Sequence, residues 1–189
     1  SEDCVKQNNF VFDWLLEKSD VKYVIIASPF DFGDIIYREG MLINADFEIW
    51  VEHIERTIDL LQSNGKKAVL IAPPPNLGEH VNLGECWARA IRFKLDALCD
   101  FELGDIGKRT TLAYKIMQRL TYKAPIVYLH LYQCPGGKCF SSLGAVPLYR
   151  DYGHWSKIGS AEFGRRFDLA KIIIDTINSF EGSAPTGGQ

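Results

Sequence analysis

The stretch Tyr23-Val24-Ile25-Ile26-Ala27-Ser28 decides the fold class of this 189-residue chain. It is short, almost continuously apolar and rich in β-branched residues, which is the pattern of a buried strand in a parallel sheet. We expect the strand to cover residues 21–28. A buried parallel strand is covered by helices, so the flanking sequence should alternate between helices and strands.

The rest of the chain shows that alternation. Apolar residues recur every three or four positions in several segments, and this period predicts helices. The predicted helices cover residues 5–18, 45–63, 85–98, 108–120 and 157–180. Two more apolar runs, residues 68–72 and 125–131, predict the remaining strands. The pattern therefore predicts an α/β fold, a three-layer sandwich with a central parallel sheet.

Length and composition favour one domain. A chain of 189 residues can bury a sizeable core but is short for two full domains. We expect a single α/β domain over residues 1–180. The segment 181–189 is rich in Gly, Ser and Pro, so it is predicted to be a disordered tail.

Charge and hydropathy exclude two classes of partner. The net charge is -3 and no run of five basic residues occurs, so the sequence predicts no nucleic-acid partner. The longest apolar runs, such as residues 24–27 and 172–174, are far too short to cross a bilayer.

A second stretch carries the chemistry. Tyr149-Arg150-Asp151-Tyr152-Gly153-His154-Trp155-Ser156 places an aspartate three residues before a histidine, ahead of the last predicted helix. An aspartate that fixes a histidine tautomer, and a histidine that accepts a proton, form two thirds of a hydrolase triad. The alternative is that Asp151 caps a turn and His154 packs at the helix start. Loops beside the carboxyl ends of parallel strands carry chemistry, so we favour a catalytic pair.

Other polar residues are assigned by their place in the pattern. Ser156 is predicted to be the N-cap of the last helix, and Ser141 and Ser142 to be loop serines. Asp31 and Asp34 follow the first strand and therefore lie at the expected binding edge. They are interpreted as carboxylates on a solvated rim, with substrate contact as the alternative.

Five cysteines leave the redox state open. Cys134-Pro-Gly-Gly-Lys-Cys139 has a turn-forming interior that can bring both sulfurs together, and a disulfide there would imply an oxidising compartment. A metal site with His130 would lack a fourth ligand, and free thiols are the third interpretation. Cys4, Cys86 and Cys99 leave an odd count.

Several of these segments follow one another in an order that resembles a known family. The pieces are Cys4, Tyr23–Ser28, Gly65-Lys66-Lys67, Pro73-Pro74-Pro75, Cys86-Trp87-Ala88-Arg89-Ala90, Cys134 to Cys139 and Pro147-Leu148-Tyr149-Arg150-Asp151. Over roughly residues 4–175 the chain resembles the SGNH (GDSL-like) hydrolase domain that is fused to acyltransferase family three membrane proteins.

The resemblance implies an O-acyltransferase or esterase of a bacterial surface glycan. His154 would be the base and Asp151 its partner, acting on a serine without any cofactor or metal. The implied partners are the glycan acceptor, an acyl donor, in which acetyl is the expected group, and an upstream membrane acyltransferase domain. The implied location is the periplasmic side of an inner membrane. The alternative is an inactive domain of the same fold that binds glycans or serves as a scaffold.

The chain also departs from the family pattern. No Gly-Asp-Ser motif occurs, because Gly33-Asp34 is followed by Ile35 and Gly104-Asp105 by Ile106. We therefore expect the N-terminal strand and its nucleophilic serine to be missing from this chain. The resemblance implies that Cys4 pairs with a cysteine in that part. Ser28 stands where the family pattern leads us to expect an asparagine.

Overall fold

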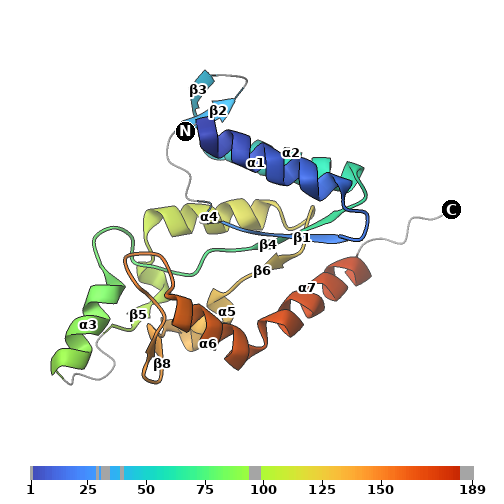
Figure 1. Ribbon diagram of the computed structural model, residues 1–189. Coiled ribbons are helices and arrows are strands. Elements are labelled where there is room, and N and C mark those ends of the chain that lie inside the picture. Colours follow the sequence, from blue (N-terminus) through green and yellow to red (C-terminus); the bar gives the residue numbers. More distant parts are fainter. Residues whose placement is uncertain (1, 29, 31–34, 39–40, 94–98, 184–189) are drawn as a thin grey trace.

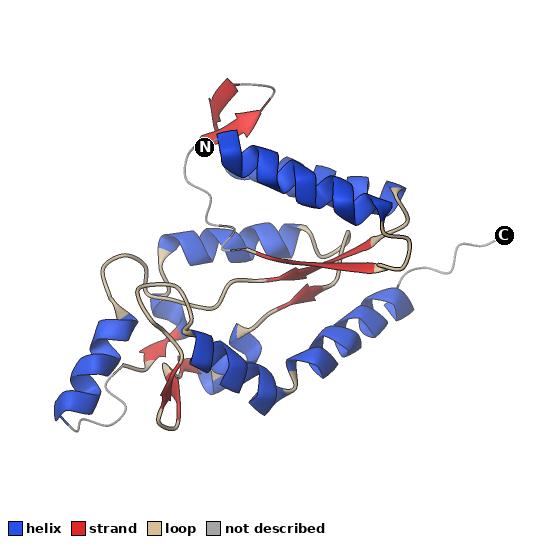
Figure 2. Cartoon of the chain, in the orientation of Figure 1, coloured by secondary structure: helices blue, strands red, loops and turns tan. Residues whose placement is uncertain are grey.

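A three-stranded parallel sheet forms the centre of the computed structural model, which describes residues 2–28, 30, 35–38, 41–93 and 99–183. Its strands are β1 (Tyr23–Ala27), β4 (Lys67–Ile71) and β6 (Ile126–Val127), in the order β1-β4-β6. Tyr23 pairs with Lys67 and Leu70 with Ile126. The prediction of an α/β fold with a parallel sheet is thus confirmed (Figures 1 and 2).

Helices cover both faces of the sheet. Figure 1 shows α1 (Glu2–Glu17) and α2 (Phe47–Ser63) on one side and α7 (Leu169–Ser183) on the other. Alternate residues of β4 explain the layers. Leu70 packs into a core with α2 and α4 (Lys108–Arg119), whereas Val69 packs into a second core with α6 (Lys157–Phe167) and α7. A strand that is apolar on both faces needs both layers.

Smaller elements connect these layers. Two antiparallel pairs are formed by β2 (Ile35–Arg38) with β3 (Met41–Asn44) and by β5 (Phe101–Glu102) with β7 (Lys138–Cys139). A third pair joins β8 (Ser142–Leu143) to β9 (Val146–Pro147). The remaining helices are α3 (Leu83–Phe93), α5 (His130–Gln133) and the single turns η1 (Leu103–Asp105) and η2 (Pro135–Gly137).

The end of the chain differs from the prediction. The expected single helix over 157–180 is two helices, because Asp168 adopts a left-handed conformation (φ 50°, ψ 64°) between α6 and α7. The carboxylate of Asp168 then accepts a hydrogen bond from the backbone nitrogen of Lys171 (3.2 Å). Helix α7 continues to Ser183, so the predicted disordered tail is wrong for residues 181–183, and residues 184–189 lie outside the described part.

Two disulfides lie in the part of the molecule that contains α3, α5 and β7. The predicted bond between Cys134 and Cys139 is present, and a second bond, which the sequence did not identify, joins Cys86 of α3 to Cys99. The side chain of Cys4 is not among those described, so its partner stays a prediction.

Over the described ranges, no helix combines the length and the apolar character that crossing a membrane requires.

Candidate active site

The loop between β9 and α6 carries the candidate catalytic pair. An isolated bridge between Tyr149 and Trp155 closes it, and the backbone nitrogen of Arg150 donates to the carbonyl of His154 (3.0 Å). Inside it, Oδ1 of Asp151 accepts hydrogen bonds from the backbone nitrogens of Gly153 (3.1 Å) and His154 (2.8 Å). The aspartate therefore shapes the same loop that presents the histidine.

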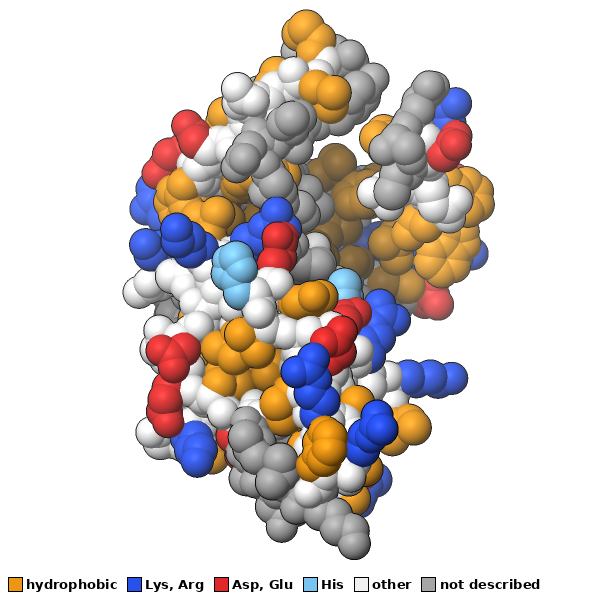
Figure 3. All heavy atoms as spheres, turned by 90° about the vertical axis from the view of Figure 1, so that its left-hand side faces the viewer, with side chains coloured by type: hydrophobic (Ala, Val, Ile, Leu, Met, Phe, Trp, Pro, Cys, Tyr) orange, Lys and Arg blue, Asp and Glu red, His pale blue; other side chains and the backbone are white. Residues whose placement is uncertain are grey.

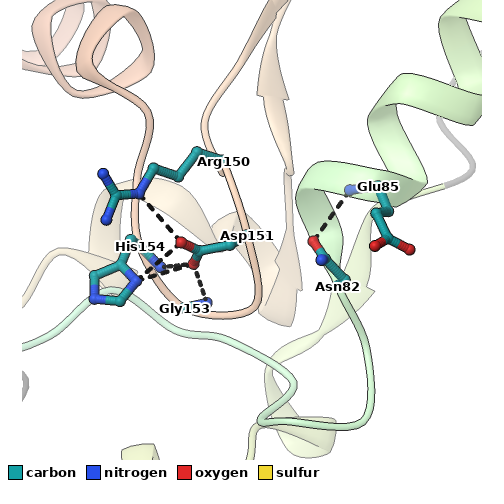
Figure 4. A network of polar contacts seen from close by, with 6 residues as sticks. All are labelled: Asn82, Glu85, Arg150, Asp151, Gly153 and His154. Carbon is teal, nitrogen blue, oxygen red and sulfur yellow. Dashed lines mark hydrogen bonds and ion pairs between the residues drawn. The ribbon is translucent and has the colours of Figure 1, made fainter.

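The side chains of Asp151 and His154 are in direct contact. Nδ1 of His154 lies 3.0 Å from Oδ1 and 3.1 Å from Oδ2 of Asp151 (Figure 4). Nε of Arg150 lies 3.1 Å from Oδ2 of Asp151. Because an ionised carboxylate only accepts, it holds the proton of a neutral imidazole on Nδ1 and leaves Nε2 with a free lone pair. Nε2 makes no hydrogen bond to any described residue, and the side chain is 65% exposed.

The carboxylate of Asp151 is strongly favoured in its ionised form. Burial alone would raise its pKa, but the backbone N–H groups of His154 and Gly153 and the His154 imidazole outweigh burial. Together they lower the pKa from 3.8 to about 2. Asp151 is therefore negatively charged at neutral pH and can stabilise an imidazolium on His154.

Hydrogen bonds of Tyr149 and Ser156 hold the two ends of the loop that carries Asp151 and His154. The hydroxyl of Tyr149 donates to the carbonyl of Pro75 and accepts from Nε2 of Gln133 (2.7 Å). Burial raises the pKa of the Tyr149 phenol, which keeps it protonated as a donor. Ser156 is the N-cap of α6, as predicted: its Oγ accepts from the nitrogen of Gly159 (2.8 Å). These contacts tie both ends of the loop to the core.

The pair faces a large cavity at the carboxyl edge of the sheet. The cavity has a volume of about 1100 Å³, and His154 and Asp151 lie on its wall together with Ala27 of β1 and Ile71 of β4. Ligands of open parallel sheets bind at this edge. Figure 3 shows histidine, acidic and basic side chains close together on this side of the molecule, near a hollow with apolar walls.

Asn76 is a candidate site residue that the sequence analysis missed. It lines the cavity after Pro75, and its Oδ1 accepts from the nitrogen of Gly78 (2.9 Å). The NH2 group therefore points the other way, and Nδ2 would lie 3.5 Å from a Cβ atom built on Gly153. Nδ2 of Asn76 makes no hydrogen bond with any described residue. Its position directly after a strand and three prolines was the available signal.

The remaining residues that the sequence analysis named near the site are Asp31, Asp34, Ser28 and His130. Asp31 and Asp34 lie outside the described residues, so their role stays a prediction. Ser28 follows β1 and lines the cavity. His130, which the sequence analysis considered for a metal site, is half-buried, and its ring centre lies 4.7 Å from that of Tyr114. Across the described ranges, no three His, Cys, Asp or Glu side chains are grouped to hold a metal ion.

Comparison with known proteins agrees with this architecture. The periplasmic domain of the Salmonella ser. Paratyphi A lipopolysaccharide acetyltransferase has a similar fold, with a TM-score of 0.55 and 15% sequence identity. The match covers 80% of this chain and 57% of that chain, so this chain spans little more than half of the Salmonella domain. A search of curated protein sequences found no match to this chain.

A family model described as the SGNH domain fused to AT3 domains matches residues 1–169. Because that match covers most of the 189 residues, this chain belongs to the family of SGNH domains fused to AT3 domains.

Proposed function

We propose that this domain transfers an acyl group, with acetyl as the expected group, to a hydroxyl of a bacterial surface glycan. One observation carries the proposal: Nδ1 of His154 is held by an ionised Asp151, and Nε2 is free at the wall of a large cavity. This is the arrangement that a general base needs. Family membership and the fold shared with a lipopolysaccharide acetyltransferase domain add support for the reaction class.

The mechanism has two steps. A serine hydroxyl attacks the carbonyl carbon of the acyl donor while Nε2 of His154 accepts the hydroxyl proton, and the imidazolium then protonates the leaving group. The glycan hydroxyl next attacks the acyl-serine and gives its proton to Nε2. Asp151 stabilises the imidazolium in both steps. The family pattern places the serine in a Gly-Asp-Ser motif, which these 189 residues do not contain.

Asn76 has a role in the same proposal. Its NH2 group is held in one orientation by the bond that Oδ1 accepts from Gly78, and it lines the cavity beside the His154 loop. A fixed donor beside the base is suited to the negative charge that develops on the carbonyl oxygen during attack. The partners of the domain would be the glycan, the acyl donor and the membrane acyltransferase domain, on the periplasmic side of the membrane.

Hydrolysis of p-nitrophenyl acetate by the natural full-length protein, with and without added glycan, tests the proposal. His154→Ala should reduce release of p-nitrophenol by about 100-fold to 10,000-fold, because the base is lost. His80→Ala is the matched control, since His80 is exposed and lines the same cavity. Equal rates for wild type and His154→Ala would contradict the proposal. Glycan binding without turnover would favour the alternative of an inactive binding domain.

A further inference from the structure

The first turn of α4 forms part of the wall of the cavity that holds His154. Gly107, Lys108, Arg109 and Thr110 all line it. The backbone N–H groups of a first helical turn lack partners within the helix, and the N-cap residue Gly107 supplies no side-chain acceptor. This turn therefore presents backbone donors and the positive end of the helix dipole at the cavity.

Charged side chains in this turn add to that positive potential. The first turn holds no acidic residue, and it begins with Lys108 and Arg109. Arg109 is paired with Glu79, with 3.3 Å between Nη1 and Oε1. Lys108 is exposed and has no ion-pair partner among the described residues. Cations at a helix N-terminus are unfavourable unless an anion is also bound there.

Thr110 provides a second, independent observation. Its side chain lies at the third position of α4, and the residue is only 3% exposed. Its hydroxyl makes no hydrogen bond with any described residue, although the residue borders the cavity. Its oxygen is not among the fully buried unpaired side-chain atoms of the described residues, so the small exposed part of this residue includes the hydroxyl. A ligand in the cavity that accepts a hydrogen bond would give the hydroxyl a partner.

The turn is also held rigidly against the loop that carries Asn76. The backbone nitrogen of Gly107 donates to the carbonyl of Asn76 (2.8 Å). A Cβ atom built on Gly107 would lie 2.8 Å from the Cα atom of Gly78, so the two glycines are in close backbone contact. The donors of α4 are therefore fixed in place before any ligand binds, which reduces the entropy cost of binding.

We propose that the first turn of α4 binds an anionic group, a carboxylate or a phosphate, on the substrate. Lys108 forms the ion pair, and Thr110 and the backbone N–H groups donate hydrogen bonds. The substrate class is then an acidic or phosphorylated sugar, in a cavity of about 1100 Å³ that has room for more than one sugar unit. The identity of the ligand as a sugar rests on the proposed function, whereas anion binding by this turn does not.

Backbone amide NMR spectra at low salt test the proposal with three probes: inorganic phosphate, glucuronate and neutral glucose. We expect saturable shifts of the Lys108–Thr110 amides with phosphate, glucuronate or both, and none with glucose. A response to glucuronate alone assigns a carboxylate ligand, and a response to phosphate alone assigns a phosphate ligand. Lys108→Gln should weaken binding by about tenfold, because a charge-assisted bond is lost.

Matched variants separate this proposal from others. Lys115→Gln removes an exposed charge from the same helix outside the cavity wall and should leave the dissociation constant unchanged. Thr110→Ser keeps the hydroxyl and should bind like the wild type, whereas Thr110→Val should bind more weakly. His154→Ala should lose acyl transfer and still bind the anion, so the two proposals can fail separately. Equal shifts with glucose, no shifts in α4, or equal weakening by Lys115→Gln would overturn the anion site.

Discussion

Gly84 in the first turn of α3 is in close backbone contact with Arg150. A Cβ atom built on Gly84 would lie 2.2 Å from the carbonyl oxygen of Arg150 and 2.8 Å from the backbone nitrogen of Asp151. No side chain fits there unless the loop that carries Asp151 moves. The N-terminal turn of α3, which the side chain of Asn82 caps through the nitrogen of Glu85 (3.1 Å), therefore packs beside the loop that carries the candidate pair Asp151 and His154 (Figure 4).

Gly84→Ala should therefore disturb the candidate site. Overpacking of this kind costs about 1–3 kcal/mol of folding free energy, and the shift of Asp151 should also lower acyl transfer. Gly104→Ala is the matched control, because nothing lies within 4 Å of a Cβ atom built there. Urea unfolding measures the effect on stability, and p-nitrophenyl acetate hydrolysis by the natural full-length protein measures the effect on activity. The same stability and activity in the two variants would refute the support that we assign to Gly84.

The carboxyl group of Asp151 should titrate with a midpoint of about pH 2. A pKa that is lowered on folding contributes stability above the unfolded value of 3.8, and this contribution is lost as the pH falls from 3.8 through about 2. Carbon-detected NMR measures the midpoint directly. In His154→Ala the pKa should rise but stay below 3.8, since two backbone donors remain. A wild-type midpoint at or above 3.8 would be inconsistent with the observed loop.

Tyr149→Phe should destabilise the fold. The change removes the donor to the buried carbonyl of Pro75 and one of the two acceptors of Nε2 of Gln133, which still donates to the carbonyl of Phe140; the loss costs about 1–3 kcal/mol. Tyr132→Phe is the control, because the Tyr132 hydroxyl makes no hydrogen bond with a described residue. Chemical denaturation compares the two variants. Equal unfolding free energies would show that the buried network does not stabilise the loop.

Four of the five cysteines should be oxidised. Peptide mapping of the unreduced protein should recover the Cys86–Cys99 and Cys134–Cys139 links. The Cys86–Cys99 bond closes a loop with a sequence separation of 13, so Cys86→Ser with Cys99→Ser should cost about 3 kcal/mol. Free thiols at all four positions would contradict both bonds and the proposed periplasmic location.

The sequence allowed much of the fold to be predicted, because its signals are local. The apolar, β-branched run at residues 23–27 correctly predicted a parallel strand, but the predicted burial is wrong: β1 is an edge strand, and Tyr23 and Ile25 are 40% and 50% exposed. The spacing of Asp151 and His154 lets the two side chains meet within one turn. Ser156 was recognised as a cap for the same reason. Each of these features depends on residues that are close in sequence.

The remaining features depend on contacts between distant residues. Asp168 breaks the last helix although the apolar period continues through it and no Gly or Pro lies within three residues of it, so no local signal marked the break. Cys86 and Cys99 meet only after α3 has packed. Asn76 becomes part of the site because the sheet edge brings its loop beside Gly153. Periodicity carries no information about such approaches.

Fluorophosphonate labelling of the natural full-length protein, read by mass spectrometry of its peptides, tests the central claim most directly. The claim is that His154, held by Asp151, activates a serine for acyl transfer. We predict that one serine is labelled and that labelling slows by at least about 100-fold in His154→Ala, while His80→Ala labels like the wild type. A serine that labels equally fast without His154, or a protein with no labelled serine, would contradict the account.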